Sequence, residues 1–217
     1  PLPFPAVPGR GPSIHLPLGI ARRLRPKALV VLEADAVSID HEWLERLARP
    51  VLERGADLVL PVHARHRYDG TMTNLVLAPL VGALFGRRLH HPFAGARAMS
   101  ARLLDHLAEL PWPLPGRGET DLWLTGTAIA ADFAVREARL GPWRVESNTR
   151  VTDLPTMVAQ TLGAVFALMD GYEDLWHRPV ASVPMPAEGA ALPPPGLPGR
   201  IDPERMLDAF RRGLSDL

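Results

Sequence analysis

Two carboxylate side chains, Glu33 and Asp35, come directly after the apolar run ALVVL at residues 28–32. The run predicts a strand, and side chains two positions apart on a strand point to the same side of the sheet. Like charges held close together repel each other unless a cation or hydrogen-bond donors lie beside them. A divalent metal ion that carries a diphosphate would relieve this repulsion, because hard cations bind carboxylate and phosphate oxygens. The pair therefore indicates a metal and phosphate site; the alternative is a strand that ends in a solvated acidic loop.

The order of the surrounding elements predicts the kind of sheet that positions these carboxylates. Strand patterns at residues 27–35, 56–63 and 134–141 alternate with helix patterns, and continuous Val and Leu indicate a sheet covered on both faces. Ligands of such sheets bind outside the carboxyl ends of the strands, where Glu33 and Asp35 lie. We expect a strand or a loop at residues 87–100. Helices are expected at residues 18–26, 40–55, 73–86, 100–110, 120–133, 152–176 and 201–217.

The distribution of prolines predicts how the chain is divided. We expect an irregular lead-in over residues 1–17 within an α/β domain of residues 1–177, then a proline-rich linker at 178–200 and a final helix at 201–217. The first strand pattern begins only near Ala28, so we expect the first strands of the fold to be missing from this chain.

Composition limits the classes of partner. The 217 residues include 24 basic and 24 acidic side chains and no cysteine. The balanced charge gives no support for a nucleic-acid partner, and the lack of cysteine excludes disulfides and thiolate metal sites. No apolar run approaches the roughly 20 residues that span a bilayer. We therefore expect a cytoplasmic protein without a membrane span whose partners are small molecules, with homo-oligomerisation left open.

Four stretches occur in the order found in one family of glycosyltransferases. They are GRG at residues 9–11, VVLEADAVSIDHEWLERL at 30–47, LVLPVHARHRYDGTMTNLVLAPLVGALFGRRLHHPFAG at 58–95 and ETDLWLTGTAIAADFAVREARLG at 119–141. Through them the chain resembles the nucleotide-diphospho-sugar transferases of the glucosyl-3-phosphoglycerate synthase and mannosylglycerate synthase type. The resemblance implies an α/β, GT-A-like (Rossmann-like) sandwich, with flanking helices on a mixed, mostly parallel sheet.

The resemblance also implies a reaction and a donor site. The reaction is transfer of a sugar from a nucleotide-diphosphate donor to a small acceptor such as a glycerate or phosphoglycerate, with Mg²⁺ or Mn²⁺ as cofactor. Asp35 and Glu33 would hold the metal ion and the nucleotide. Arg10, between Gly9 and Gly11, would face the diphosphate.

On the acceptor side, the resemblance implies a catalytic carboxylate and a polar pocket. Asp121 would orient the acceptor hydroxyl or accept its proton; the alternative is that Thr120 or Asp121 only caps a helix. Guanidinium groups suit the phosphate or carboxylate of an acceptor. The pocket would contain Arg65, Arg67, Thr71, Thr73, Asn74 and Trp123, although a Trp at helical spacing also fits core packing.

Three positions depart from the family's pattern. The first acid of its Asp-x-Asp motif is Glu33 here, and Ala96 stands where an Asp or Glu is expected. The family's metal-binding His after a Leu-Gly pair has no counterpart behind Leu140 and Gly141, where Glu146 could supply an oxygen ligand. These departures leave open a degenerate, non-catalytic relative that binds a nucleotide sugar or a protein partner. A nucleotidyltransferase is a third, weaker hypothesis.

Overall fold

The computed structural model describes residues 10–33, 36–66, 70–110, 120–142, 154–194 and 203–215. Within these ranges, only the backbone is described for residues 10–16, 154–157, 160, 203, 205, 206 and 209. No helix in the described ranges is long and apolar enough to cross a membrane.

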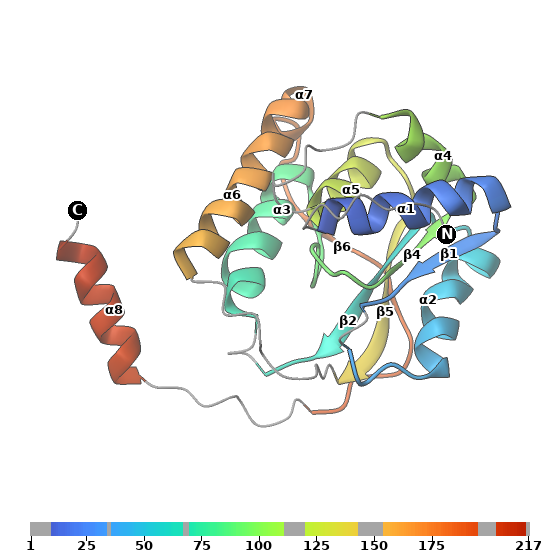
Figure 1. Ribbon diagram of the computed structural model, residues 1–217. Coiled ribbons are helices and arrows are strands. Elements are labelled where there is room, and N and C mark those ends of the chain that lie inside the picture. Colours follow the sequence, from blue (N-terminus) through green and yellow to red (C-terminus); the bar gives the residue numbers. More distant parts are fainter. Residues whose placement is uncertain are drawn as a thin grey trace.

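A five-stranded mixed sheet forms the centre of the molecule, in the order β1-β4-β2-β5-β7 (Figure 1). Strand β4 runs antiparallel to both of its neighbours, whereas β2, β5 and β7 pair in parallel. Four of the five strands therefore point the same way, as the sequence predicts for an α/β sandwich. The strands are β1 (Ala28–Val31), β4 (Arg97–Ser100), β2 (Leu58–Ala64), β5 (Val135–Pro142) and β7 (Ala187–Glu188).

Helix α2 (His41–Arg54) covers one face of the sheet. Its N-cap Asp40 accepts a hydrogen bond from the Trp43 amide at 3.0 Å, and Gly55 ends it with a φ of 65°. Both ends lie where the sequence predicts them, because a cap and a left-handed glycine are local signals. The buried Trp43 and Leu47 pack against residues of β2, β4 and β5.

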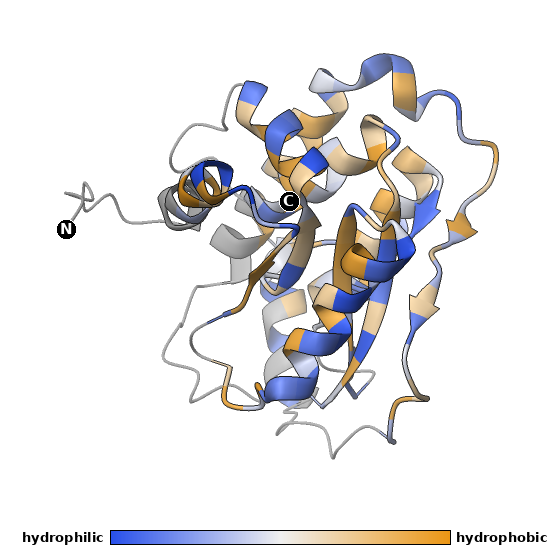
Figure 2. Cartoon of the chain, turned by 90° about the vertical axis from the view of Figure 1, so that its right-hand side faces the viewer, coloured by the Kyte–Doolittle hydropathy of each residue, from blue (hydrophilic) through white to orange (hydrophobic). Residues whose placement is uncertain are grey.

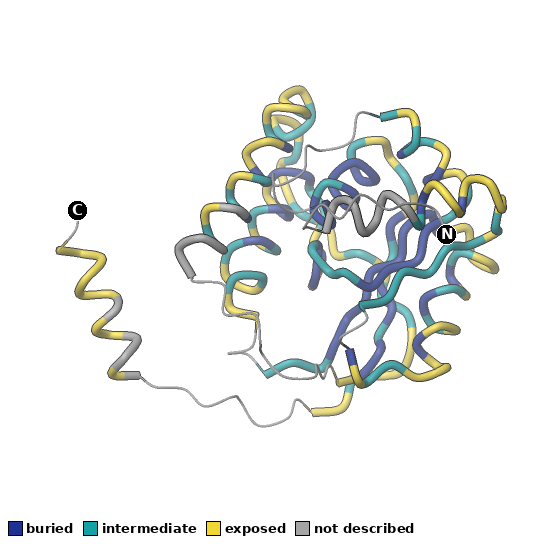
Figure 3. The backbone as a smooth tube through the Cα atoms, in the orientation of Figure 1, coloured by how far each residue is buried: buried dark blue, intermediate teal, exposed yellow. Residues whose placement is uncertain are grey.

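The opposite face carries the larger core, which α1 (Arg10–Leu24), α3 (Ala78–Phe85), α4 (Ala101–Glu109), α5 (Thr120–Ala130) and α6 (Leu154–Gly171) share. A π-helical segment, Thr73–Leu77, leads into α3. Hydrophilic and hydrophobic residues alternate along the helices (Figure 2), and the central strands are the most buried part of the chain (Figure 3). Burial of apolar side chains on both faces is the main source of stability in such a sandwich.

Three sequence predictions about element boundaries are wrong. Helix α1 begins at Arg10, within the predicted irregular lead-in, because a proline in the first turn costs no hydrogen bond and Pro17 removes only one. Strand β1 ends at Val31, two residues before Glu33. The helix predicted over residues 152–176 is divided at Tyr172 into α6 and α7 (Glu173–Trp176).

The stretch predicted as a linker contributes to the fold as far as residue 188. Strand β6 (Val183–Pro184) pairs with β3 (Arg87–Arg88), and β7 extends the main sheet beside β5. Proline is tolerated in such short strands at a sheet edge, where an amide hydrogen is not needed. Beyond it, α8 (Pro203–Ser215) lies apart from the sheet (Figure 1), with Leu207, Phe210 and Leu214 exposed.

A buried carboxylate, Asp57, joins three elements where β2 and β5 begin. It accepts hydrogen bonds from the Ala134 amide at 3.0 Å, from Ser100 Oγ at 2.7 Å and from Arg102 Nε at 3.1 Å. Burial alone would raise the pKa of Asp57, but these hydrogen bonds outweigh it and hold the pKa below its ordinary value.

We expect Asp57→Asn to lower the free energy of unfolding by about 2 kcal/mol, because the amide cannot accept all of these hydrogen bonds. A carboxyl group with a lowered folded pKa stabilises the protein above its unfolded pKa, and this contribution is lost as the pH falls through the folded value. Urea denaturation should therefore show a lower free energy of unfolding for the variant than for wild type at neutral pH. This difference should shrink as the pH falls below 3.8, the ordinary pKa of an aspartate. Asp105→Asn, at an exposed position of α4, is the matched control, and equal effects of the two substitutions would contradict the assignment.

Candidate functional site

Part of the predicted site lies where β1, β2 and β5 end, which we call the carboxyl end of the sheet. Because β4 is antiparallel, its first residue lies at the same end, and Arg97 pairs in register with Val31. Ala64, the last residue of β2, pairs with Pro142 of β5. The loop of residues 89–96, which leads into β4, therefore meets the ends of the other strands. Ligands of open α/β sheets bind at this end.

The side chain of Glu33 lies against the backbone of this loop. A Cβ atom added at Gly95 would be 2.2 Å from Glu33 Oε1, so only a glycine leaves room for the carboxylate. The Ala36 amide donates to the Glu33 carbonyl oxygen at 3.1 Å, which marks a turn directly after β1. Strand β1 thus ends before Glu33, so the alternation of side chains along a strand does not place the Glu33 carboxylate. Asp35 itself lies outside the described residues.

A buried ion pair fixes the same loop from the other side. Arg97 Nη2 lies 2.7 Å from Asp121 Oδ1, and Arg97 Nη1 donates to the Asp121 carbonyl oxygen at 3.2 Å. Arg97 also donates to the carbonyl oxygen of Ala94. The side chains of Arg97 and Asp121 are 0% and 1% exposed, so water screens neither charge. The pair joins β4, the start of α5 and the loop that carries Gly95.

Arg65 follows β2 and reaches the start of the helical segment at residues 71–85. Its Nη1 atom lies 3.2 Å from the position of a Cβ at Gly70, which has a φ of +68°. The Asn74 amide donates to the Gly70 carbonyl oxygen at 2.9 Å, and Thr71 and Thr73 belong to the same first turns. The structure therefore brings four predicted acceptor residues together at a helix N-terminus, which favours an anion.

Two buried histidines, His63 and His91, lie at the same end of the sheet, and sequence reasoning missed the first of them. Their ring centroids are 5.9 Å apart with an interplanar angle of 19°. The ring centroids of Trp43 and His63 are 5.0 Å apart. Burial, with a further contribution from Arg65, lowers the pKa of His63 to about 3. Burial is also the main cause that holds the pKa of His91 well below its ordinary value. Both rings are neutral at physiological pH.

His90 turns the opposite way and binds a buried carboxylate of β5. Its amide donates to Glu137 Oε1 at 2.7 Å, and its Nδ1 lies 2.8 Å from Glu137 Oε2. The hydrogen bond to Glu137, whose side chain is 0% exposed, raises the pKa of His90. This contact anchors the loop of residues 89–96 to the sheet. Of the two adjacent histidines, His90 is exposed and His91 is buried.

Several predicted site residues are not brought into the site by the described structure. Arg10 and Gly11 belong to the first turn of α1, so the predicted Gly-Arg-Gly turn is helical from Arg10 onward. Trp123 packs against the larger core, as the structural alternative predicts. In the described ranges, no three His, Asp or Glu side chains could hold a metal ion together. Gly9, Asp35, Arg67 and Glu146 lie outside the described residues, and their assignments stay predictions.

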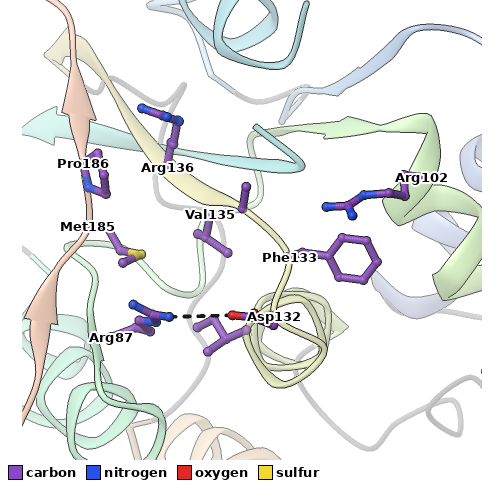
Figure 4. A pocket seen from close by; sticks show the side chains of 10 residues that line it. Arg87, Arg102, Asp132, Phe133, Val135, Arg136, Met185 and Pro186 are labelled. Atoms are coloured by element: carbon purple, nitrogen blue, oxygen red, sulfur yellow. Dashed lines mark ion pairs between the residues drawn. The ribbon is translucent and has the colours of Figure 1, made fainter. Parts of the chain in front are cut away.

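A cavity of about 350 Å³ lies at the amino end of the sheet, where β5 begins (Figure 4). Phe133, Val135 and Met185 are among the side chains that line it. Three arginines also line it, and each is paired with a carboxylate: Arg87 with Asp132 at 3.8 Å, Arg136 with Glu188 at 3.3 Å, and Arg102 with Asp57. This pairing leaves the cavity without an evident charge to recognise a ligand.

No protein-family model matches the sequence. No curated protein matches it either.

Solved structures with a similar fold include complexes of glucosyl-3-phosphoglycerate synthase from Mycobacterium tuberculosis. The complex with phosphoglyceric acid is 23% identical, with a TM-score of 0.60 over 78% of this chain and 57% of that chain. The complex with Mn²⁺, UDP and glucosyl-3-phosphoglycerate is 23% identical, with a TM-score of 0.61 over 79% and 58%. The complex with Mn²⁺, UDP-glucose and glycerol 3-phosphate is 23% identical, with a TM-score of 0.60 over 79% of this chain and 58% of that chain. The chain thus spans somewhat more than half the length of these neighbours.

The match confirms the fold predicted from the sequence resemblance. The chain shares a GT-A-like fold with these solved structures, with a mixed, mostly parallel sheet between helices. At this level of identity the similarity establishes the fold and leaves the activity to be argued from the site.

We expect Arg97→Met to destabilise the protein by about 3–5 kcal/mol, because it leaves the Asp121 carboxylate buried without its cation. Replacing both partners, as Arg97→Met with Asp121→Leu, should recover part of this loss, since no buried charge remains. Thermal and urea denaturation measure both values. Arg49→Met breaks an exposed pair with Glu53 on α2 and is the control. Equal destabilisation by the two single substitutions would show that the buried pair has no special role.

Proposed function

We propose that this chain is the core of a metal-dependent glycosyltransferase, which moves a sugar from a nucleotide-diphosphate donor to a small anionic acceptor. The observation that carries the proposal is that Glu33, after β1, and Arg65, after β2, both lie at the carboxyl end of a GT-A-like sheet. The Glu33 carboxylate suits a metal-bound nucleotide, and the Arg65 guanidinium suits the anionic group of an acceptor. Both lie beside the loop of residues 89–96.

For the donor side, we assign metal and nucleotide contacts to Asp35 and Glu33, with Glu146 as a further oxygen ligand. Carboxylate oxygens suit Mg²⁺ or Mn²⁺, and Glu33 lies just beyond the end of β1, at the carboxyl end of the sheet. The metal ion, when bound, neutralises the negative charge of the leaving diphosphate. Gly95 supports this assignment, because its missing side chain allows Glu33 to lie beside the loop.

For the acceptor side, we assign Arg65, Arg67, Thr71, Thr73 and Asn74 to a site for a phosphate or carboxylate. The Arg65 guanidinium and the start of the helical segment both favour an anion. The Mycobacterium tuberculosis enzyme is described in complex with phosphoglyceric acid and with glycerol 3-phosphate. A phosphorylated or carboxylated three-carbon acceptor is therefore the first candidate for this chain.

For Asp121, we propose that it orients the site rather than accepting a proton. Its carboxylate is 1% exposed and paired with Arg97, so a substrate hydroxyl has no direct access to the bonded oxygen. Through Arg97 it holds Ala94 and hence the Gly95 backbone against Glu33. A transferase of this kind accelerates its reaction mainly by electrostatic stabilisation of the transition state. Holding charged groups in position is therefore a large part of catalysis.

A second candidate function, binding of a nucleotide sugar without turnover, is favoured by one observation. Ala96 is 1% exposed, so the position at which the family carries an acid holds a buried methyl group. Release of UDP from UDP-glucose that depends on added phosphoglycerate and Mn²⁺ would establish turnover. Nucleotide binding without such release would favour the second function.

We expect UDP with Mn²⁺ to raise the melting temperature, since a ligand that binds only the folded state stabilises it by mass action. Asp35→Asn should abolish the shift, whereas Asp132→Asn should retain it, because Asp132 is 95% exposed at the amino end of the sheet. Asparagine also tolerates the φ of 55° at residue 132. Differential scanning fluorimetry measures the shift; its absence in wild type, or an equal shift in both variants, would remove the metal site.

Gly95→Ala tests the position of Glu33 within the same site. We expect it to reduce the shift with UDP and Mn²⁺, because the new Cβ displaces the carboxylate. Gly163→Ala on α6 is the control, since its Cβ would meet nothing within 4 Å. If the two substitutions leave the shift equally intact, Glu33 has no part in binding.

We expect Arg65→Ala to weaken binding of phosphoglycerate at least tenfold while leaving UDP binding unchanged, because only the acceptor's anion contacts the guanidinium. Isothermal titration calorimetry with each ligand separates the two effects. Arg87→Ala, in the cavity at the amino end, should change neither affinity. A parallel loss of both ligands in Arg65→Ala would assign this arginine to the donor.

A further inference from the structure

His91 has a buried nitrogen atom and lies close enough to Arg65 of the proposed acceptor site to feel its positive charge. Its Nδ1 lies 2.7 Å from the carbonyl oxygen of His90, which can only accept a hydrogen bond. The proton of the neutral ring therefore lies on Nδ1, and Nε2 carries a lone pair.

The Nε2 atom of His91 has no hydrogen-bond partner among the described residues. The residue is 7% exposed, and the Nε2 atom itself is buried. Buried polar atoms in native proteins are nearly always paired, and an exception calls for an explanation such as a ligand. The atom lies in the loop of residues 89–96, beside the groups assigned to the donor and the acceptor.

The surroundings of His91 keep this lone pair available. Burial lowers its pKa most, and the positive charge of Arg65 acts in the same direction. The ring is thus neutral near physiological pH and accepts a hydrogen bond instead of donating one from Nε2. A ligand must supply either a hydrogen-bond donor or a metal ion.

The geometry disfavours a metal ion at this atom. The rings of His63 and His91 are nearly parallel, with an interplanar angle of 19° and centroids 5.9 Å apart. Lone pairs lie in the ring planes, so those of two stacked rings do not converge on one ion. The neighbouring Arg65 guanidinium would also repel a cation. A ligand with a hydroxyl group and an anionic group fits this place: the hydroxyl supplies the hydrogen-bond donor, and the anion is attracted by Arg65.

We propose that His91 is a specificity-determining residue, which accepts a hydrogen bond from a hydroxyl group next to the phosphate or carboxylate that Arg65 binds. This inference rests on the proposed acceptor site and selects acceptors within it. The anionic group of the ligand binds the Arg65 guanidinium, and the adjacent hydroxyl group donates a hydrogen bond to His91 Nε2. A site with a buried acceptor atom rejects analogues that lack the donor, because the atom is then left unpaired.

Calorimetry with two probes tests the inference. The first probe is 3-phosphoglycerate, and the second is 3-phosphonooxypropanoate, which has the same two anionic groups but no hydroxyl. We expect wild type to bind the first at least tenfold more tightly. His91→Phe should reduce the affinity for the first probe to that for the second and leave the second unchanged. His91→Gln restores an acceptor oxygen and should keep the preference.

The controls separate this inference from the proposed function. His106→Phe, on α4 beside Phe133, should keep the wild-type preference. Equal affinity of wild type for both probes would overturn the role of His91 and leave the acceptor site standing. Failure of both probes to bind would overturn the acceptor site together with this inference, while the response to UDP and Mn²⁺ would still report on the donor site.

Discussion

The ion pair between Arg97 and Asp121 is the constraint on which the rest of the site depends. Two charges without access to water are stable only when each satisfies the other, and here the arginine also binds the Asp121 and Ala94 carbonyl oxygens. The pair therefore joins the chain around residues 94–97 to the start of α5, which lies 24 positions later in the sequence. The position of Glu33 follows from it, because the carboxylate lies against the glycine next to Ala94.

The two ends of the sheet have different roles. At the amino end, Asp57 joins β2, β4 and β5 through hydrogen bonds, and the arginines of the nearby cavity are paired with carboxylates. At the carboxyl end, Glu33 lies against Gly95 of the loop of residues 89–96, and the positive charge of Arg65 acts on His91 of the same loop. The amino end thus joins elements of the fold, whereas the carboxyl end carries the side chains that we assign to ligands.

Local signals made much of the fold predictable from sequence. Asp40 and Gly55 define α2 within the chain itself, and the Val and Leu runs identify β1 and β2. The boundaries that failed depend on distant partners: β7 exists because β5 offers it an open edge, and α1 extends through its prolines while packing on α4 and α5. Arg65, Thr71, Thr73 and Asn74 lie at the start of one helical segment, and their role in acceptor binding stays a prediction. Arg97, Gly95 and Glu137 were not recognised, because their roles come from contacts with residues far away in the sequence.

The central claim is that a metal-bound nucleotide diphosphate occupies the carboxyl end of the sheet. Paramagnetic broadening of amide signals by Mn²⁺, measured on the isotope-labelled chain with UDP present, locates the ion directly. The account predicts strong broadening at Glu33, Ala64 and Gly95 and sharp signals at Phe133 and Val135. Sharp signals around Glu33, or stronger broadening at the amino end, would contradict it.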